Sequence, residues 1–218
     1  MSSYTKENYI KALFYLHQKD AAISLSDLGE ELQVNKSTAN DMIKKLQADG
    51  IVVSEKYKPI KITEKGKLRA AEIIRKHRLS EMFLMQIMEF GWEEVHEIAE
   101  ELEHIKTNQF FDRMDELLGF PFIDPHGSPI PDKNGNFKKP NYKRLSQFPE
   151  KSTVVIKALR ESSTDFLLFL NKKELQLNTK ITIDHIEDFD GSYTISYNGH
   201  SDVVLGKSIC DRFLVEPV

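Results

Sequence analysis

Apolar residues in the first 70 positions recur at helical spacing, in short stretches that end at clear stops. The pattern predicts a helix beginning after Thr5, a second over residues 25–32 and a third over residues 36–48. Serine or asparagine residues precede the second and third stretches and are expected to cap them. Two β-branched runs, 51–53 and 60–63, flank a basic tip and predict a β-hairpin. The N-terminal region is therefore expected to be a helix-turn-helix followed by a wing.

The pattern changes twice after the hairpin. One long helix is expected from residue 64 to about 91, and further helix over 92–118. Residues 119–149 then lose periodicity and collect six prolines, which indicates an ordered loop or linker. Beyond it, five short strands separated by turn dipeptides, with a short helix over 164–175, predict a small β-barrel. The fold class is thus mainly α with a small β domain.

Composition is that of an ordinary soluble globular protein, with 40% hydrophobic and 29% charged residues among 218. The chain starts with polar residues, and no stretch approaches the ~20 apolar residues that a membrane span needs. We therefore expect a cytoplasmic protein. Cys210 is the one cysteine, which excludes an internal disulfide and a CxxC zinc knuckle.

The net charge of −4 divides unevenly along the chain. Residues 1–76 hold 14 Lys and Arg against 10 Asp and Glu, whereas residues 77–218 hold 16 against 24. A basic N-terminal part suits nucleic acid, and an acidic remainder suits cations. Chance clustering on two solvated surfaces is the alternative.

The third predicted helix and the hairpin tip carry the residue types that contact duplex DNA. In a helix-turn-helix the second helix of the motif enters the major groove, and the wing contacts the backbone. Short hydroxyl and amide side chains reach base edges, and lysines neutralise phosphates. The candidate DNA-binding residues are Lys36, Ser37, Thr38, Asn40, Asp41 and Lys44 on the helix, and Lys56, Tyr57 and Lys58 at the tip.

Histidines and carboxylates recur at helical spacing between residues 77 and 104. His77 and Glu81 lie four apart, and a second set at i, i+4, i+7 and i+8 is expected on one face of the next helix. That second set is His96, Glu100, Glu103 and His104. It borders an apolar stripe, so its burial would be costly unless a divalent cation lay among the side chains. The alternative is a solvated, glutamate-rich helix with histidines placed by chance.

The chain resembles the diphtheria toxin repressor and manganese transport regulator family along essentially its whole length. Seven segments carry the resemblance: Glu7–Ala12, Val34–Thr38, Leu46–Val52, Ile62–Gly66, Arg75–Glu81, Val95–His104 and Asp124–Pro131. The family implies a metal-dependent repressor, not an enzyme, that binds operator DNA as a homodimer and controls metal-homeostasis genes. It also implies a winged helix-turn-helix domain over 1–72, a helical metal-binding and dimerisation domain over 73–142, a linker over 143–149 and an SH3-like, FeoA-like barrel over 150–218.

The resemblance also implies two metal positions per subunit. The ligands matching one are Glu100, Glu103 and His104 with Asn8, and those matching the other are His77, Glu81 and His96, with Asp124, His126 and, loosely, Asp165 as further candidates. Asn8 departs from the Asp or Met of relatives, and Lys11 stands where some manganese regulators have Glu. No cysteine lies near Glu100, so oxygen and imidazole ligands favour Mn²⁺, with Fe²⁺ second.

Two other function classes remain open at this stage. Glu93 with His96 and Glu101 with His104 match the Glu-x-x-His spacing of di-iron carboxylate enzymes, but those enzymes place the two motifs on different helices. A metal-independent winged-helix regulator, sensing a small ligand in its C-terminal barrel, is the other.

Overall fold

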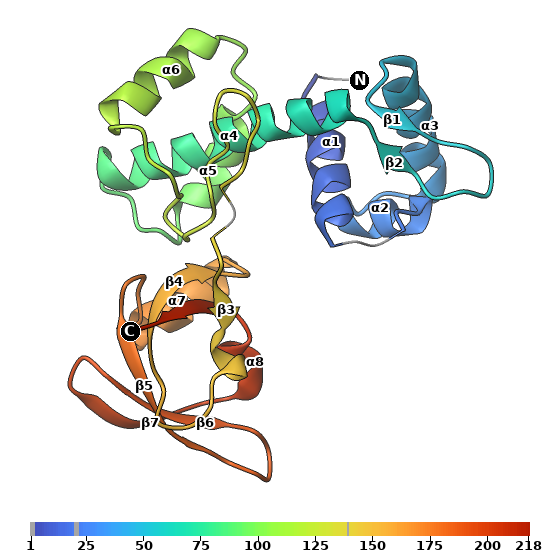
Figure 1. Cartoon of the computed structure of the whole chain (residues 1–218). Helices are drawn as coiled ribbons and strands as arrows, with labels where there is room; N and C mark the ends of the chain where they lie inside the picture. Colours follow the sequence, from blue (N-terminus) through green and yellow to red (C-terminus); the bar gives the residue numbers. More distant parts are fainter. Residues whose placement is uncertain (1–2, 20–21, 139) are drawn as a thin grey trace. The chain divides into compact units, whose positions relative to one another are not determined.

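The computed structural model describes residues 3–19, 22–138 and 140–218, and it divides into two compact units (Figure 1). The first holds the described residues of Met1–Ser80, Ile98–Phe120 and Ile130–Phe137, and the second Glu81–Glu97, Pro121–Pro129 and Lys138–Val218. Each unit has its own hydrophobic core.

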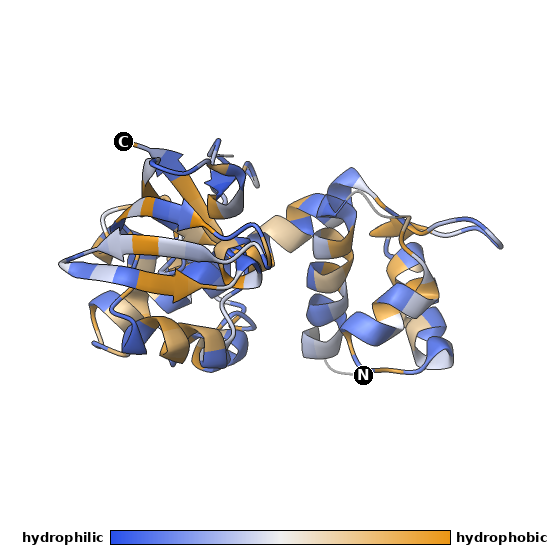
Figure 2. Cartoon of the chain, turned by 90° about the horizontal axis from the view of Figure 1, so that it is seen from below, coloured by the Kyte–Doolittle hydropathy of each residue, from blue (hydrophilic) through white to orange (hydrophobic). Residues whose placement is uncertain are grey.

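The first unit begins with the predicted winged helix-turn-helix. Its elements are α1 (Ser3–Gln18), α2 (Leu25–Glu31), α3 (Lys36–Ala48), β1 (Val52–Val53) and β2 (Lys61–Ile62). The two strands pair antiparallel with Val52 opposite Ile62, and Ile23 forms a further bridge to Ile60. In Figure 2 the apolar positions of the helices near the N-terminus face one another, whereas the protruding hairpin tip is mostly hydrophilic. The amphipathic pattern therefore builds one core and leaves the tip in solvent.

Side-chain caps fix where α2 and α3 begin. Ser24 accepts hydrogen bonds from the backbone of Ser26 and Asp27, and the Asp27 side chain accepts one from the Ser24 backbone. Asn35 Oδ1 accepts from the backbone N–H of Thr38 at 2.8 Å. These caps satisfy N–H groups that have no partner inside their helices, so both helices start where the sequence places a short polar side chain.

The middle of the chain forms three helices, α4 (Glu64–Gln86), α5 (Val95–Leu102) and α6 (Asn108–Leu117). The expectation that α4 reaches residue 91 is wrong, because Glu89 adopts a left-handed conformation with φ of 59°. The further helix predicted over 92–118 is present as two helices, because α5 ends at Leu102 and α6 begins at Asn108. Lys76 Nζ donates to the carbonyl of Ile105 at 2.9 Å, which satisfies a backbone group that the break would otherwise leave without a partner.

The second unit contains one six-stranded antiparallel sheet in the order β3-β8-β4-β5-β6-β7. The strands are β3 (Lys143–Arg144), β4 (Thr153–Leu159), β5 (Lys180–Ile186), β6 (Tyr193–Tyr197), β7 (His200–Leu205) and β8 (Phe213–Pro217), and the helices are η1 (Leu145–Gln147), α7 (Thr164–Lys172) and α8 (Lys207–Cys210). The five predicted strands are all present.

Residues 143–149, expected to be a linker, belong instead to this domain. Lys143 and Arg144 pair with Val215 and Leu214 of β8, and Leu145 is fully buried in the core of the unit. Two residues are too few for a periodic signal, so this edge strand exists only through its pairing with β8.

Among the described residues, no helix combines the length and the apolar composition needed to cross a membrane.

Candidate metal clusters and DNA-binding face

The outward face of α3 carries the side chains predicted to contact DNA. The opposite face is buried, with Ala39, Met42, Ile43 and Leu46 in the core of the unit. The six predicted residues Lys36, Ser37, Thr38, Asn40, Asp41 and Lys44 are exposed or half-buried. Because the core face fixes the rotation of α3, these six side chains are held on the solvent side.

The hairpin tip presents two cations and an aromatic ring to solvent. Tyr57 is 93% exposed and has a φ of 66°, inside a turn that Lys58 N closes on the carbonyl of Glu55 at 3.1 Å. Lys56 Nζ lies 4.9 Å from the centre of the Tyr57 ring. Asn40 and Lys44 of α3 and Lys56 and Tyr57 of the tip line one groove of about 700 Å³. A face of this composition suits the sugar-phosphate backbone beside a base-contacting helix.

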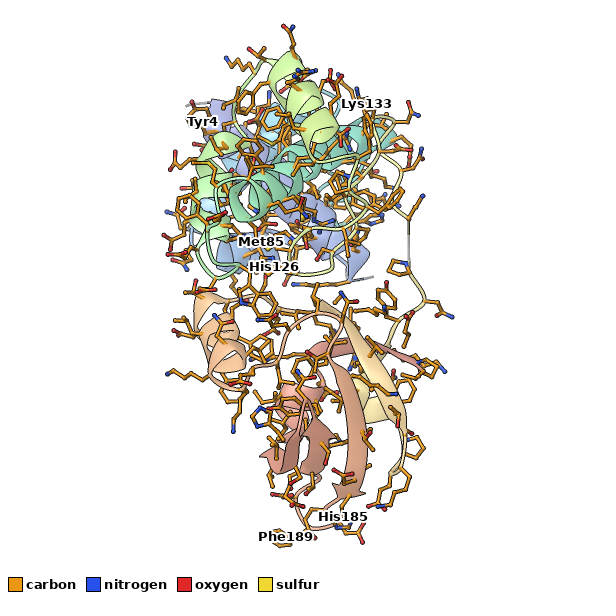
Figure 3. All side chains as sticks on the ribbon, turned by 90° about the vertical axis from the view of Figure 1, so that its left-hand side faces the viewer. Tyr4, Met85, His126, Lys133, His185 and Phe189 are labelled. Atoms are coloured by element: carbon orange, nitrogen blue, oxygen red, sulfur yellow. The ribbon has the colours of Figure 1, made fainter. Side chains whose placement is uncertain are left out.

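Four predicted metal ligands, which we call the Glu81 cluster, gather in the second unit: Glu81, His96, Asp124 and His126. Ligand atoms of Glu81, Asp124 and His126 all lie within 4.8 Å of one another, and all three side chains are buried. His96 Nδ1 lies 3.2 Å from Glu81 Oε1, with its ring 51% exposed. Figure 3 labels His126 and also Met85, which lies near the end of α4. An octahedral site places opposite ligand atoms about 4–4.5 Å apart, so a small contraction would let one divalent ion contact all of them.

The orientation of His126 favours metal binding. Its Nε2 lies 2.9 Å from the carbonyl oxygen of Trp92, and a carbonyl only accepts, so Nε2 carries the proton. In the neutral ring Nδ1 is then an acceptor, and it lies 3.9 Å from Glu81 Oε1. With Nδ1 unprotonated, two electron-rich atoms face each other there, as they do around a cation. A histidine ligand typically donates its second nitrogen to a carbonyl in this way.

The loop that carries Asp124 and His126 is held rigidly against β4. Asp124 Oδ1 accepts from two backbone N–H groups of the loop at 2.9 Å, and the N–H of Leu159 donates to the carbonyl of His126 at 2.9 Å. Gly127 has a φ of 85°, and a Cβ on it would lie 2.3 Å from the carbonyl oxygen of Lys157. Only glycine permits this approach, which explains the Pro-His-Gly sequence of the loop.

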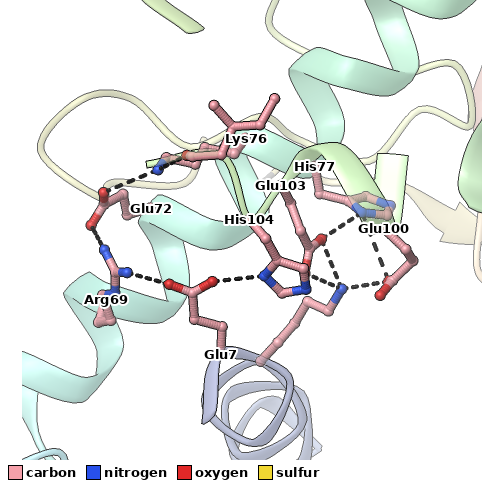
Figure 4. Close-up of polar contacts among 10 residues, drawn as sticks. Glu7, Arg69, Glu72, Lys76, His77, Glu100, Glu103 and His104 are labelled. Atoms are coloured by element: carbon pink, nitrogen blue, oxygen red, sulfur yellow. Dashed lines mark hydrogen bonds and ion pairs between the residues drawn. The ribbon is translucent and has the colours of Figure 1, made fainter. Parts of the chain in front are cut away.

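A second group, which we call the Lys11 cluster, lies in the first unit and consists of Lys11, His77, Glu100 and Glu103. Lys11 Nζ contacts Glu100 Oε1 and lies 2.8 and 2.9 Å from the two carboxylate oxygens of Glu103. Figure 4 shows the carboxylates of Glu100 and Glu103 beside His77. His77 Nδ1 lies 2.7 Å from Glu103 Oε2. The side chains of Lys11, Glu100 and Glu103 are 12%, 34% and 0% exposed. A carboxylate as buried as Glu103 needs positive charge beside it, and the Lys11 ammonium supplies that charge.

Burial of Lys11 lowers the pKa of its ammonium, but attraction to Glu103 and Glu100, together with hydrogen bonds to both, raises it by more. The net pKa therefore lies above the ordinary value for lysine, so Lys11 stays charged at neutral pH.

His104 lies beside this cluster and contacts α1. Its Nδ1 donates to Glu7 Oε2 at 2.7 Å (Figure 4). The His104 ring also stacks on Tyr4, with ring centroids 4.4 Å apart. Glu7 also forms an ion pair with Arg69. The hydrogen bond to Glu7 fixes the tautomer and leaves Nε2 of His104 as the acceptor nitrogen of the neutral ring. Asn8 Oδ1 is buried and has no hydrogen-bond partner among the described residues, a condition that a bound cation would relieve.

The structure departs from the predicted helical pattern of metal ligands at the end of α5. Glu103 and His104 lie beyond the end of α5 at Leu102, so the expected single helix face over 96–104 is wrong. His96 accompanies Glu81 in the second unit, whereas Glu103 accompanies His77 in the first. The prediction from helical spacing was wrong because the chain turns after α5, so successive side chains there contact different elements.

Asp165 is exposed in the first turn of α7 and belongs to none of the metal-type clusters found in the described part of the chain. Sequence reasoning missed the roles of Glu7 and Lys11. Both share a face of α1 with Asn8 at i, i+1 and i+4, and that spacing was the available signal.

Comparison with known proteins identifies three family domains in succession. Residues 1–60 match the iron dependent repressor N-terminal DNA binding domain, residues 63–132 the iron dependent repressor metal binding and dimerisation domain, and residues 143–217 the FeoA domain. The last match supports the expected SH3-like domain.

Full-length relatives and solved structures agree with these domains. The iron-dependent repressor IdeR of Mycobacterium tuberculosis is 27% identical over 98% of this chain and 97% of its own. The HTH-type transcriptional regulator MntR of Bacillus pumilus is 30% identical over 55% of this chain and 83% of its own. A manganese-dependent transcriptional repressor solved in complex with manganese has a TM-score of 0.86 at 27% identity, covering 98% of this chain and 100% of that one. This chain belongs to the iron-dependent repressor family, which includes the diphtheria toxin repressor and MntR, as its sequence motifs predicted.

Proposed function

We propose that this protein is a transcriptional repressor that binds operator DNA as a homodimer when Mn²⁺, or Fe²⁺ as the second candidate, is bound, and that it controls metal-homeostasis genes. The observation that carries the proposal is the Glu81 cluster, a buried group of imidazole and carboxylate ligands in a chain that also presents a winged helix. Relatives named as iron-dependent repressors and as a manganese regulator support it. All of these relatives are transcriptional repressors or regulators, which supports the further proposal that this chain is not an enzyme.

The donor set of the Glu81 cluster fits a hard divalent ion. Two carboxylates and two imidazoles offer oxygen and nitrogen, and the one cysteine of the chain, Cys210, is buried in the core of the C-terminal domain. When bound, the ion supplies positive charge that offsets the buried Glu81 and Asp124 carboxylates. His126 contributes Nδ1, and the Trp92 carbonyl holds its ring in the orientation that ligation needs.

DNA contact is assigned to α3 and the hairpin tip. Ser37, Thr38 and Asn40 would reach base edges, while Lys36, Lys44 and the tip lysines would neutralise phosphates. A two-fold dimer must place its two α3 helices about 34 Å apart to enter successive major grooves. Exposed apolar side chains on and after α6, at Phe110, Leu117 and Phe120, offer the kind of surface that a dimer buries.

The metal acts through differential affinity. An ion that binds the DNA-competent arrangement more tightly than the others shifts the population toward it. By reciprocity, operator DNA must tighten metal binding by the same factor.

The test is selection of bound fragments from sheared DNA of the source organism with Mn²⁺ and with EDTA, at one fixed salt concentration. We expect enriched fragments in Mn²⁺ and at least tenfold weaker binding of those fragments in EDTA. His126→Ala should lose the Mn²⁺ dependence, whereas His185→Ala, an exposed histidine of β5 paired with Glu150, should keep it. Equal affinity in Mn²⁺ and EDTA would contradict metal gating and favour the metal-independent winged-helix regulator.

A further inference from the structure

The Lys11 cluster places the side chain of the protein itself where a divalent ion would otherwise bind. Ligand atoms of His77, Glu100 and Glu103 lie within 4.8 Å of one another, the spacing of a metal site. The ammonium of Lys11 contacts one oxygen of Glu100 and both oxygens of Glu103. These are the oxygens with which a metal at this position would bind.

Two cations do not share these oxygens without strong repulsion. Glu103 is fully buried and Lys11 nearly so, so water screens their interaction little. A metal that enters must therefore displace the ammonium from Glu103, and Lys11 must find another position for its charge. The contact joins α1 of the winged helix to the segment after α5, so it also ties these elements together when no metal is bound.

We propose that Lys11 is a built-in competitor for divalent metal at the Glu100 and Glu103 carboxylates, and that it raises the metal concentration at which this second position fills. This inference rests on the proposed function, because it concerns the regulation of the same repressor. It goes further in assigning different thresholds to the two clusters. In the Glu81 cluster, the imidazoles of His96 and His126 beside Glu81 Oε1 can themselves become metal ligands and need not leave, whereas the Lys11 ammonium cannot ligate, so this cluster fills first.

The surroundings of Asn8 support exchange of the Lys11 ammonium for a metal ion, rather than permanent occupation of the cluster by Lys11. Its Oδ1 is buried without a hydrogen-bond partner among the described residues, and Asn8 lies one turn from Lys11 on the same face of α1. An oxygen left in that condition gains a partner when a metal replaces the ammonium. A lysine fixed permanently in the cluster would leave this oxygen unpaired in every state.

The experiment measures Mn²⁺ binding by equilibrium dialysis in a Glu81→Gln background, which removes the competing cluster. Lys11→Met keeps the length and apolar stem of the side chain and removes the charge, and Lys11→Gln is a second neutral variant. We expect both to bind Mn²⁺ at least tenfold more tightly than the Lys11 parent. Lys11→Arg keeps the charge and should stay within threefold of the parent. Lys6→Met is the matched control, because Lys6 also lies on α1 but pairs with Asp49 on the surface.

A second measurement, the melting temperature, does not require a metal affinity to be determined. Without metal, Lys11→Met should lower the melting temperature, since it leaves the carboxylate of Glu103 without its cation. With saturating Mn²⁺ the same variant should gain more in melting temperature than the parent does. A variant with merely damaged packing would lose in both conditions.

Three results would overturn the inference. In the first, the neutral Lys11 variants bind Mn²⁺ no more tightly than the parent. In the second, Lys11→Arg gains as much Mn²⁺ affinity as the neutral variants do. In the third, the parent already binds Mn²⁺ at Glu103 as tightly as at the Glu81 cluster. The repressor proposal would fail in a different way, through DNA binding that does not depend on Mn²⁺. In that case equilibrium dialysis would still show whether the Lys11 variants bind Mn²⁺ more tightly than the parent. If neither neutral variant folds, the third result still decides whether the inference holds. It is measured by comparing Mn²⁺ binding of Glu103→Gln with that of the otherwise unaltered chain.

Discussion

Replacing Gly127 by alanine tests whether the loop of the Glu81 cluster is held as tightly as its geometry indicates. A Cβ at this position would lie 2.3 Å from the carbonyl oxygen of Lys157 and 2.5 Å from Cα of Ala158. Both neighbours are backbone atoms of β4, so no side chain can rotate away. The φ of 85° adds a conformational cost for any residue with a Cβ.

The magnitude follows from two contributions. Placing alanine in the left-handed region costs about 1–2 kcal/mol, and forcing an extra methyl into a packed contact costs about 1–3 kcal/mol. Gly127→Ala should therefore lower the free energy of unfolding of the second unit by about 2–5 kcal/mol. Gly199, in the turn between β6 and β7, is a matched control, because its φ is 84° and a Cβ added there would meet nothing within 4 Å. Gly199→Ala should show only the conformational cost of about 1–2 kcal/mol.

The assay is urea unfolding in EDTA, followed by the fluorescence of Trp92, the single tryptophan, whose Nε1 donates to Asn171 at 2.7 Å within the same unit. The difference between the two variants isolates the contact with β4. A difference below about 0.5 kcal/mol would refute the reasoning, because the loop would then have room to move. Mn²⁺ should also stabilise Gly127→Ala less than the unaltered protein, since the loop carries Asp124 and His126.

Three further predictions concern other parts of the chain. Lys56→Ala and Lys58→Ala should each reduce the slope of log affinity for DNA against log salt by about 1, measured by fluorescence anisotropy; an unchanged slope would remove the hairpin tip from the interface. Burial raises the pKa of the Cys210 thiol to about 12, so at pH 8 the folded protein should resist a thiol reagent that reacts fully in urea; rapid labelling of the folded protein would contradict this. Ser24→Ala should cost about 1 kcal/mol through loss of the α2 cap. A hydrogen bond from the Ser24 backbone N–H, with a smaller effect of the Ser24 side chain, holds the pKa of Asp27 below its ordinary value. The contribution of Asp27 to stability is therefore present at neutral pH and is lost as pH falls through the acidic range; Asp27→Asn should flatten that loss in acid unfolding, and an unchanged pH profile would contradict the link.

Local sequence determined the winged helix almost completely. Apolar spacing, the caps at Ser24 and Asn35 and the polar hairpin tip all act within a few residues, so the order of α1, α2, α3 and the wing follows from short-range rules. The same holds for β4 to β8, whose β-branched runs are long enough to show a pattern. The two-residue β3 showed none, because its hydrogen-bond partner β8 lies about 70 residues away along the chain.

Local sequence also supplied most candidate ligands, but it did not decide which of them meet. Helical spacing put His96 and Glu103 on one face, yet the chain turns after Leu102 and sends them to different clusters. Lys11 reached Glu103 across 92 positions of sequence, a contact that no periodicity encodes. Residue types and spacing therefore predicted a cation site in this part of the chain. Only tertiary packing brought the members of each cluster together, because it buried Glu103 beside Lys11 and Glu81 beside His126.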